Sequence, residues 1–154
     1  MEKLKRLLDT LESKIPNQEV LNTLVSKSSV GWHIEHSLLV MNLVIESIEK
    51  SDPDNYKRTF NFKRLLVFTI NKIPRGKVRA PKAVQPKENF TIDSLKIHLE
   101  KGRSNFEKLK YLSAKNYFEH PFMGNLNLKE TIKFIGLHTE HHLKIMNEII
   151  ESKN

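Results

Sequence analysis

Three of the seven histidines of this chain lie close together near its C-terminus, in the stretch FIGLHTEHHLKIMNEII. On an α-helix, His138 and His142 would lie one turn and about 40° apart, with His141 just beside them. The same side of the helix would carry the apolar residues Phe134, Ile135, Ile145 and Ile149. A His-x-x-x-His pair presents two ring nitrogens from successive turns, a spacing that suits a single metal ion.

A second pair, His33 and His36, stands three residues apart in SVGWHIEHSLLVMN, on the predicted helix face that also carries Val40, Leu43 and Val44. Helical bundles build metal sites from ligands that project inward from facing helices. One of these histidines and the C-terminal pair would form a three-histidine site, which leaves a coordination position open for water or substrate. The residues alone leave a second interpretation open, in which these histidines lie in the core or at an interface and their ring nitrogens are satisfied without a metal.

The helices that would position the N-terminal pair follow from apolar spacing and cap residues. Leucines at helical spacing predict a first helix that ends at Pro16, and a short helical turn is expected at 19–25. Ser28 or Ser29 is a plausible N-cap for a long helix that runs to about Lys50. Residues 61–72 form either a short helix or an extended apolar segment.

Two more long helices are predicted in the C-terminal half. Thr91 or Asp93 begins one that runs to about Lys115, residues 117–125 form a loop, and a capping box of Asn127 and Glu130 begins the last helix. No strand alternation competes with this pattern. The expected fold is therefore all-α, a four-helix bundle with a long basic, proline-rich crossover loop.

The crossover, KIPRGKVRAPKAVQPK at 72–87, holds six basic residues, three prolines and no acidic residue, so it cannot be a regular helix. It is either a solvated connection or a site for an anionic substrate or cofactor, with Arg75, Lys77, Arg79 and Lys82 as candidates. Nucleic-acid binding ranks last, because the segment has no interleaved aromatic residue and no base-reading motif accompanies it.

Length and composition set further bounds. A chain of 154 residues is expected to form one domain, residues 1–154, with a substantial core. The absence of cysteine excludes disulfides, zinc–thiolate sites and a nucleophilic thiol. The net charge of +8 is weak support for an anionic partner. No apolar run is long enough to predict a membrane span, and the N-terminus lacks an apolar signal core, so a cytoplasmic location is expected.

The stretches SVGWHIEHSLLV, IPRGKVRAPK and HPFMGNLNLKETIKFIGLHTEHHLKI resemble the DinB-like (YfiT-like) superfamily of metal-dependent four-helix bundles. The resemblance covers most of the chain. It implies that His36, His138 and His142 bind a divalent metal such as zinc, nickel or iron, with His33 as the reserve ligand. His33 and His141 are otherwise either donors that orient the ligands or partly exposed neighbours.

Characterised members of this superfamily include thiol-dependent S-transferases and an isomerase that uses a low-molecular-weight thiol. The resemblance therefore implies an enzyme, a transferase, isomerase or hydrolase, that acts on a small-molecule substrate, and it implies a homodimer. A low-molecular-weight thiol is the expected co-substrate, and neither a membrane nor a specific nucleic acid is an expected partner. The alternative is a non-catalytic, stress-associated binding protein whose histidine site is structural or vestigial.

Four other residues near these motifs have predicted roles. Trp32 either packs in the core or lines the metal pocket. His120 is expected to fix the turn before the last helix, and His98 to lie at the surface or in a groove. Glu35 points away from His36 on the helix and is not predicted to be a ligand.

Overall fold

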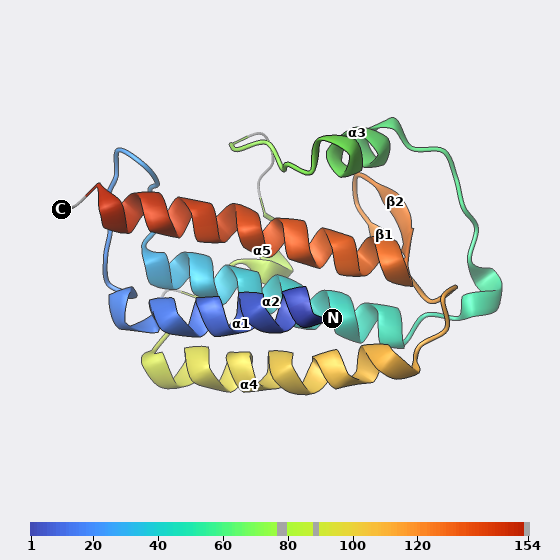
Figure 1. The fold of residues 1–154 in the computed structure, drawn as a ribbon, viewed down its shortest axis with the longest axis horizontal. Helices are drawn as coiled ribbons and strands as arrows, with labels where there is room; N and C mark the ends of the chain where they lie inside the picture. The colour runs from blue at the N-terminus through green and yellow to red at the C-terminus, as the bar shows by residue number, and fades with distance from the viewer. Residues whose placement is uncertain (77–79, 88–89, 153–154) are drawn as a thin grey trace.

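The computed structural model describes residues 1–76, 80–87 and 90–152. The described chain is mostly helical, which confirms the predicted helical class (Figure 1). Its α-helices are α1 (Glu2–Lys14), α2 (Val30–Glu49), α3 (Phe62–Ile70), α4 (Ile92–Lys108) and α5 (Leu128–Glu151). Four 3-10 turns are also described: η1 (Ile15–Asn17), η2 (Pro53–Asn55), η3 (Lys82–Val84) and η4 (Leu109–Tyr111).

The four longer α-helices lie side by side along the length of the molecule (Figure 1). Helix α2 packs against α4 and α5, and α1 packs against both of these as well. The core between them is apolar, and its fully buried members include Leu8, Leu11, Ile34, Leu38, Met41, Ile45, Leu95, Leu99, Phe106, Met146 and Ile149. Burying these side chains is the main driving force that holds the helices together.

Local side-chain caps begin three of the helices as predicted. The Ser29 hydroxyl accepts a hydrogen bond from the backbone N–H of Trp32 and begins α2. Capping boxes begin α4 at Thr91 and α5 at Asn127. Each cap pairs backbone N–H groups that a helix leaves unsatisfied in its first turn.

Residues 117–125 are not simply a loop, which corrects the prediction for this segment and adds a small sheet to the helical fold. Strands β1 (Tyr117–His120) and β2 (Gly124–Asn127) pair antiparallel, with His120 opposite Gly124. Gly124 has φ +67°, a conformation that glycine adopts without strain. Strands of four residues are too short to show a clear alternation in the sequence.

One further prediction is met in part, one needs correction and one alternative is settled. The short helical turn expected at 19–25 is present in part, because the Asn22 carbonyl accepts hydrogen bonds from the backbone N–H groups of Val25 and Ser26. Helix α4 ends at Lys108 rather than near Lys115, because Asn116 turns back and its amide donates to the Ile48 and Ser51 carbonyls at the end of α2. Residues 61–72 contain a helix, α3.

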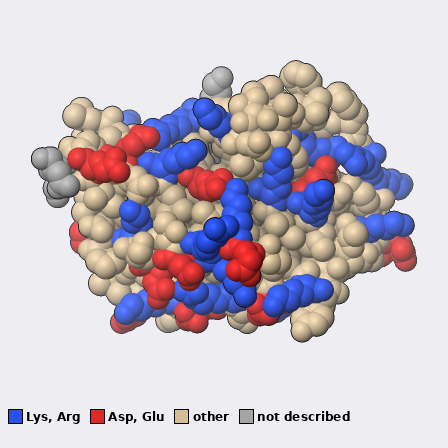
Figure 2. All heavy atoms as spheres, in the orientation of Figure 1, with Lys and Arg blue, Asp and Glu red and all other residues tan. Residues whose placement is uncertain are grey.

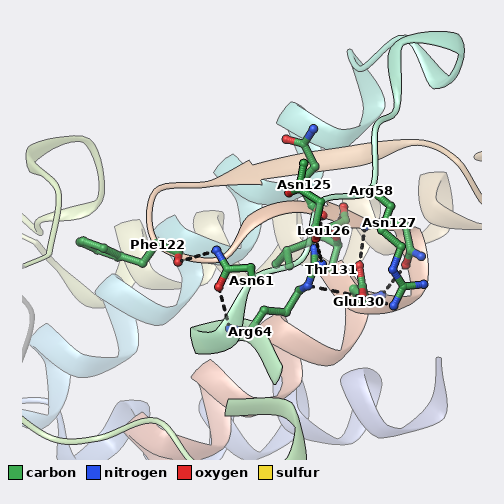
Figure 3. Close-up of polar contacts among 10 residues, drawn as sticks. Arg58, Asn61, Arg64, Phe122, Asn125, Leu126, Asn127, Glu130 and Thr131 are labelled. Carbon is green, nitrogen blue, oxygen red and sulfur yellow. Dashed lines mark hydrogen bonds and ion pairs between the residues drawn. The ribbon is translucent and has the colours of Figure 1, made fainter. Parts of the chain in front are cut away.

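A buried arginine fastens α3 to the hairpin and to the start of α5 (Figure 3). Arg64 donates hydrogen bonds to the carbonyl oxygens of Asn125, at 2.9 Å, and of Thr59. Its Nε lies 3.9 Å from a carboxylate oxygen of Glu130, which also lies 3.7 Å from the exposed guanidinium of Arg58. One side chain thus connects three separate segments of the chain.

Arg64→Ala is expected to lower the free energy of unfolding by about 2–4 kcal/mol, because two carbonyls lose a charged hydrogen-bond donor. Arg64→Lys is expected to recover little of this loss, since an ammonium group lacks the planar fork that reaches both carbonyls. Urea denaturation measures both effects. The matched control, Arg58→Ala, should change stability by less than about 1 kcal/mol. Equal losses at the two arginines would contradict the assigned role of Arg64.

Candidate metal centre

Helices α2 and α5 bring three histidines together in the interior. His36 comes from α2, and His138 and His142 come from successive turns of α5. One ring nitrogen of each lies within 4.8 Å of the other two. The ring centroids of His36 lie 5.1 Å from His138 and 4.7 Å from His142. The structure therefore places side by side the three histidines that the resemblance implies as ligands, whereas the residues alone left His33 and His36 both open.

The three nitrogens lie close enough together that they could hold a metal ion. Nitrogens bound to one tetrahedral zinc ion lie about 3.3 Å apart, given Zn–N distances of about 2.0–2.1 Å. The three nitrogens lie within 4.8 Å of one another, so the rings would have to move closer together to bind one ion. His36 and His142 are buried and His138 is partly buried, so the cluster is shielded from bulk water.

The ring of His36 is held on two sides. Its Nδ1 lies 2.7 Å from the carbonyl oxygen of Val84, in η3 of the basic crossover. A carbonyl can only accept, so Nδ1 carries the proton, and the lone pair of the neutral ring lies on Nε2. Trp32 stacks on one face of the ring, with ring centroids 5.0 Å apart and planes 19° apart. Trp32 thus packs against the cluster, and part of the crossover contacts it directly.

His33 lies outside the three-histidine cluster and contacts His142 through a ring nitrogen. Its Nδ1 lies 2.9 Å from Nδ1 of His142, and its Nε2 lies 3.0 Å from the hydroxyl oxygen of Ser26. If His142 donates from Nδ1, its Nε2 keeps a free lone pair, and His33 then donates from Nε2 to Ser26. With both rings neutral, no other placement of the protons in this chain of contacts leaves Nε2 of His142 free to bind a metal.

One ring nitrogen of His138, Nδ1, is buried without a visible hydrogen bond in the described part of the chain. An unpaired buried polar group costs about 1–3 kcal/mol, which a bound ligand can offset. The donor set and this atom together fit a divalent metal that accepts imidazole nitrogen.

Burial keeps the clustered histidines neutral at pH 7. It lowers the pKa of His33 from 6.5 to about 4, with further contributions from His36, His141 and Arg75. Burial also lowers the pKa of His36, His138 and His142. Metal binding requires the neutral imidazole, so these rings need not lose a proton before they bind.

The remaining histidines lie outside the cluster. His141 is partly exposed and stands perpendicular to His142, with ring centroids 5.1 Å apart. His120 Nδ1 accepts from the backbone N–H groups of Phe122 and Met123 and so fixes the hairpin turn, as predicted. His98 on α4 lies 2.8 Å from a carboxylate oxygen of Glu35 on α2. Glu35 accordingly points toward α4, which agrees with its exclusion as a ligand.

The candidate anion-binding residues of the crossover are only partly described. Arg75 forms a two-pronged ion pair with Glu148 on α5, at 2.6 and 2.7 Å. Lys82 is exposed in η3. Lys77 and Arg79 lie outside the described residues. Anion binding by this set stays a prediction.

Sequence reasoning missed the two groups that orient the cluster, Val84 and Ser26. The Val84 contact uses a backbone carbonyl, which every residue has, so no residue type signals it. Ser26 lies seven residues before His33, across the turn that leads into α2. Only its place near a predicted helix start could have drawn attention to it.

No protein-family model matches this chain, and no curated protein and no solved structure matches it either. What the structure itself defines is a mostly helical protein with three histidines close enough to hold a metal ion. Among the described residues, no helix is both long and apolar enough to cross a membrane.

Proposed function

We propose that this chain is a metal-dependent enzyme of the DinB-like kind, in which His36, His138 and His142 hold one divalent ion. The observation that carries the proposal is the cluster itself, three imidazole nitrogens within 4.8 Å from two helices far apart in sequence. The side-by-side packing of α1, α2, α4 and α5 supports a four-helix bundle of that superfamily (Figure 1). The buried Nδ1 of His138, which has no hydrogen-bond partner in the described part of the chain, also favours a bound ligand at this site.

A divalent ion bound by three neutral imidazoles supplies a Lewis acid with room for a further ligand. The residues of the chain itself prepare the site. The Val84 carbonyl orients His36, His33 holds His142 in the binding tautomer, and Trp32 covers one face of the His36 ring. Because the chain has no cysteine, a thiol in the reaction must come from the small-molecule side. A low-molecular-weight thiol is the proposed co-substrate.

The proposal is tested with untagged protein, stripped of metal and titrated calorimetrically with Zn²⁺, Ni²⁺ and Fe²⁺. We expect one ion per chain for at least one of them. The loaded and stripped forms are then compared for transfer of a small thiol, such as free cysteine, to a model electrophile. Faster transfer by the loaded form supports the enzyme. Stoichiometric binding without any acceleration across a panel of thiols and electrophiles would favour the non-catalytic alternative.

His33→Ala is expected to weaken metal binding about 10- to 100-fold while the stoichiometry stays at one, because His142 loses the partner that orients it. Ser26→Ala should have a smaller effect in the same direction. His120→Ala is the matched control, since it removes a histidine outside the cluster. Calorimetric titration measures all three variants. Unchanged affinity in His33→Ala would contradict the orienting role, and complete loss of binding would show that His33 is itself a ligand.

A further inference from the structure

A small hollow lies beside the histidine cluster, between the segment after α3 and the outer face of α5. Its volume is about 220 Å³. Asn71, Lys72 and Arg75 line one side of it, and Glu140, His141 and Lys144 line the other. Binding pockets for whole drug-sized ligands measure about 300–1,000 Å³, so this hollow fits one end group of a small molecule.

The two walls of the hollow are fixed by the fold. Leu137, Glu140, His141 and Lys144 are spaced at i, i+3, i+4 and i+7, so they lie on one face of α5. Asn71 ends α3 in the left-handed conformation, φ 53°, and redirects the chain. The ion pair of Arg75 with Glu148 then fastens the segment 71–75 to α5. The hollow is thus bounded by anchored backbone on one side and a helix on the other.

The charges around the hollow are unbalanced. Glu140 is paired with Lys3 at 2.9 Å, and Arg75 is paired with Glu148 at 2.6 Å. Within the described part of the chain, the ammonium groups of Lys72 and Lys144 have no ion-pair partner. Figure 2 shows many Lys and Arg side chains on the face that carries α5, with Asp and Glu among them. At this hollow the excess charge is positive and lies on two lysines from opposite walls.

The hollow adjoins the proposed metal site through one side chain. His141 lines it, and the His141 ring lies 5.1 Å from the ring of His142, centroid to centroid. Leu137 and Lys144 flank His138 and His142 along the same helix. An anion in the hollow would therefore lie near His141, whose ring contacts a member of the histidine cluster.

We propose that Lys72 and Lys144 bind a small oxyanion, a carboxylate or phosphate group, in the hollow between residues 71–75 and α5. One consequence of this inference rests on the proposed function, namely that the substrate of the histidine site carries such an oxyanion group. The binding of the oxyanion itself does not depend on a metal. The two lysines differ from the crossover residues that the sequence singled out, and Lys144 lies outside the crossover altogether.

The test is a titration of the ¹⁵N-labelled, full-length, metal-stripped chain with inorganic phosphate and, separately, with acetate, at constant ionic strength set with chloride. We expect saturable shifts of the backbone N–H resonances of residues 71, 72, 73 and 75 and of the His141 side chain. In Lys72→Gln/Lys144→Gln the Kd should rise about ten-fold, the order of magnitude of two exposed ion pairs. The matched control is Lys96→Gln/Lys129→Gln, which removes the same charge from exposed lysines elsewhere and should leave the Kd unchanged.

The outcomes separate this inference from the proposed function. Equal weakening in both double variants, or no saturable shift with either anion, would overturn the oxyanion site even if the wild-type chain binds one metal ion. Phosphate or acetate binding that depends on the two lysines supports the site even if no metal binds. The preferred anion shows whether the group is a phosphate or a carboxylate. Lys72→Gln/Lys144→Gln should also retain the metal stoichiometry of the wild-type chain.

Discussion

His138→Ala and His142→Ala are each expected to abolish stoichiometric binding of a divalent metal. The two rings come from successive turns of one helix, and together with His36 they bring three nitrogens within 4.8 Å. Removal of one leaves two donors, too few for a tight site at micromolar metal concentrations. The metal content of dialysed, untagged protein, measured by atomic emission, gives the result directly.

The controls for this prediction are histidines that the structure assigns to other tasks. His98→Ala and His120→Ala should keep one ion per chain, because His98 pairs with Glu35 and His120 holds the hairpin turn. Circular dichroism of each variant checks that the helices remain. Full metal content in the double variant His138→Ala/His142→Ala would show that the pair only fills the core.

The metal-free chain is expected to lose stability steeply as the pH falls from about 6.5 toward 4. The pKa values of His33 and His120 are lowered on folding from 6.5 to about 4, in both cases mainly by burial. As the pH falls, the unfolded chain therefore takes up protons on these two histidines before the folded chain does. Their contribution to the free energy of unfolding is full above pH 6.5 and is lost progressively below it. Each of the two should lower the free energy of unfolding by roughly 3 kcal/mol between pH 6.5 and pH 4. His36, His138 and His142 act in the same direction.

Urea denaturation at a series of pH values between 7.5 and 4.5 measures this loss. His120→Asn removes one titrating ring while its side-chain oxygen can still accept from the turn N–H groups, as in an Asx turn. The pH dependence of that variant should flatten by about 1.4 kcal/mol per pH unit in the same window. A free energy of unfolding that stays constant down to pH 5 would contradict the buried, neutral state of these histidines.

The parts of the fold that the sequence predicts well depend on local signals. The Ser29 cap and the Asn127 capping box involve residues within three positions of each other, so their meaning does not depend on the rest of the chain. The face shared by His138 and His142 likewise follows from helix geometry alone. These local rules suffice to place the candidate ligands on the correct sides of their helices.

The parts that the sequence does not predict depend on partners far away along the chain. His36 and the Val84 carbonyl are 48 residues apart, and His33 and His142 are 109 apart. The role of Arg64 depends on a hairpin more than 50 residues later, whose four-residue strands carry no periodic signal of their own. Such contacts arise only when the helices pack. The orienting groups of the site and the hollow beside it therefore came from the structure.

The most direct test of the metal site is a crystal structure of the chain loaded with zinc, with anomalous diffraction recorded on both sides of the zinc absorption edge. The account predicts one strong anomalous peak per chain, about 2.0–2.1 Å from a ring nitrogen of each of His36, His138 and His142. Nε2 of His36 and of His142 should face the ion, while the Val84 carbonyl and His33 keep their contacts with the other ring nitrogens. A cluster without a peak, or zinc bound only elsewhere, such as between Glu35 and His98, would contradict it.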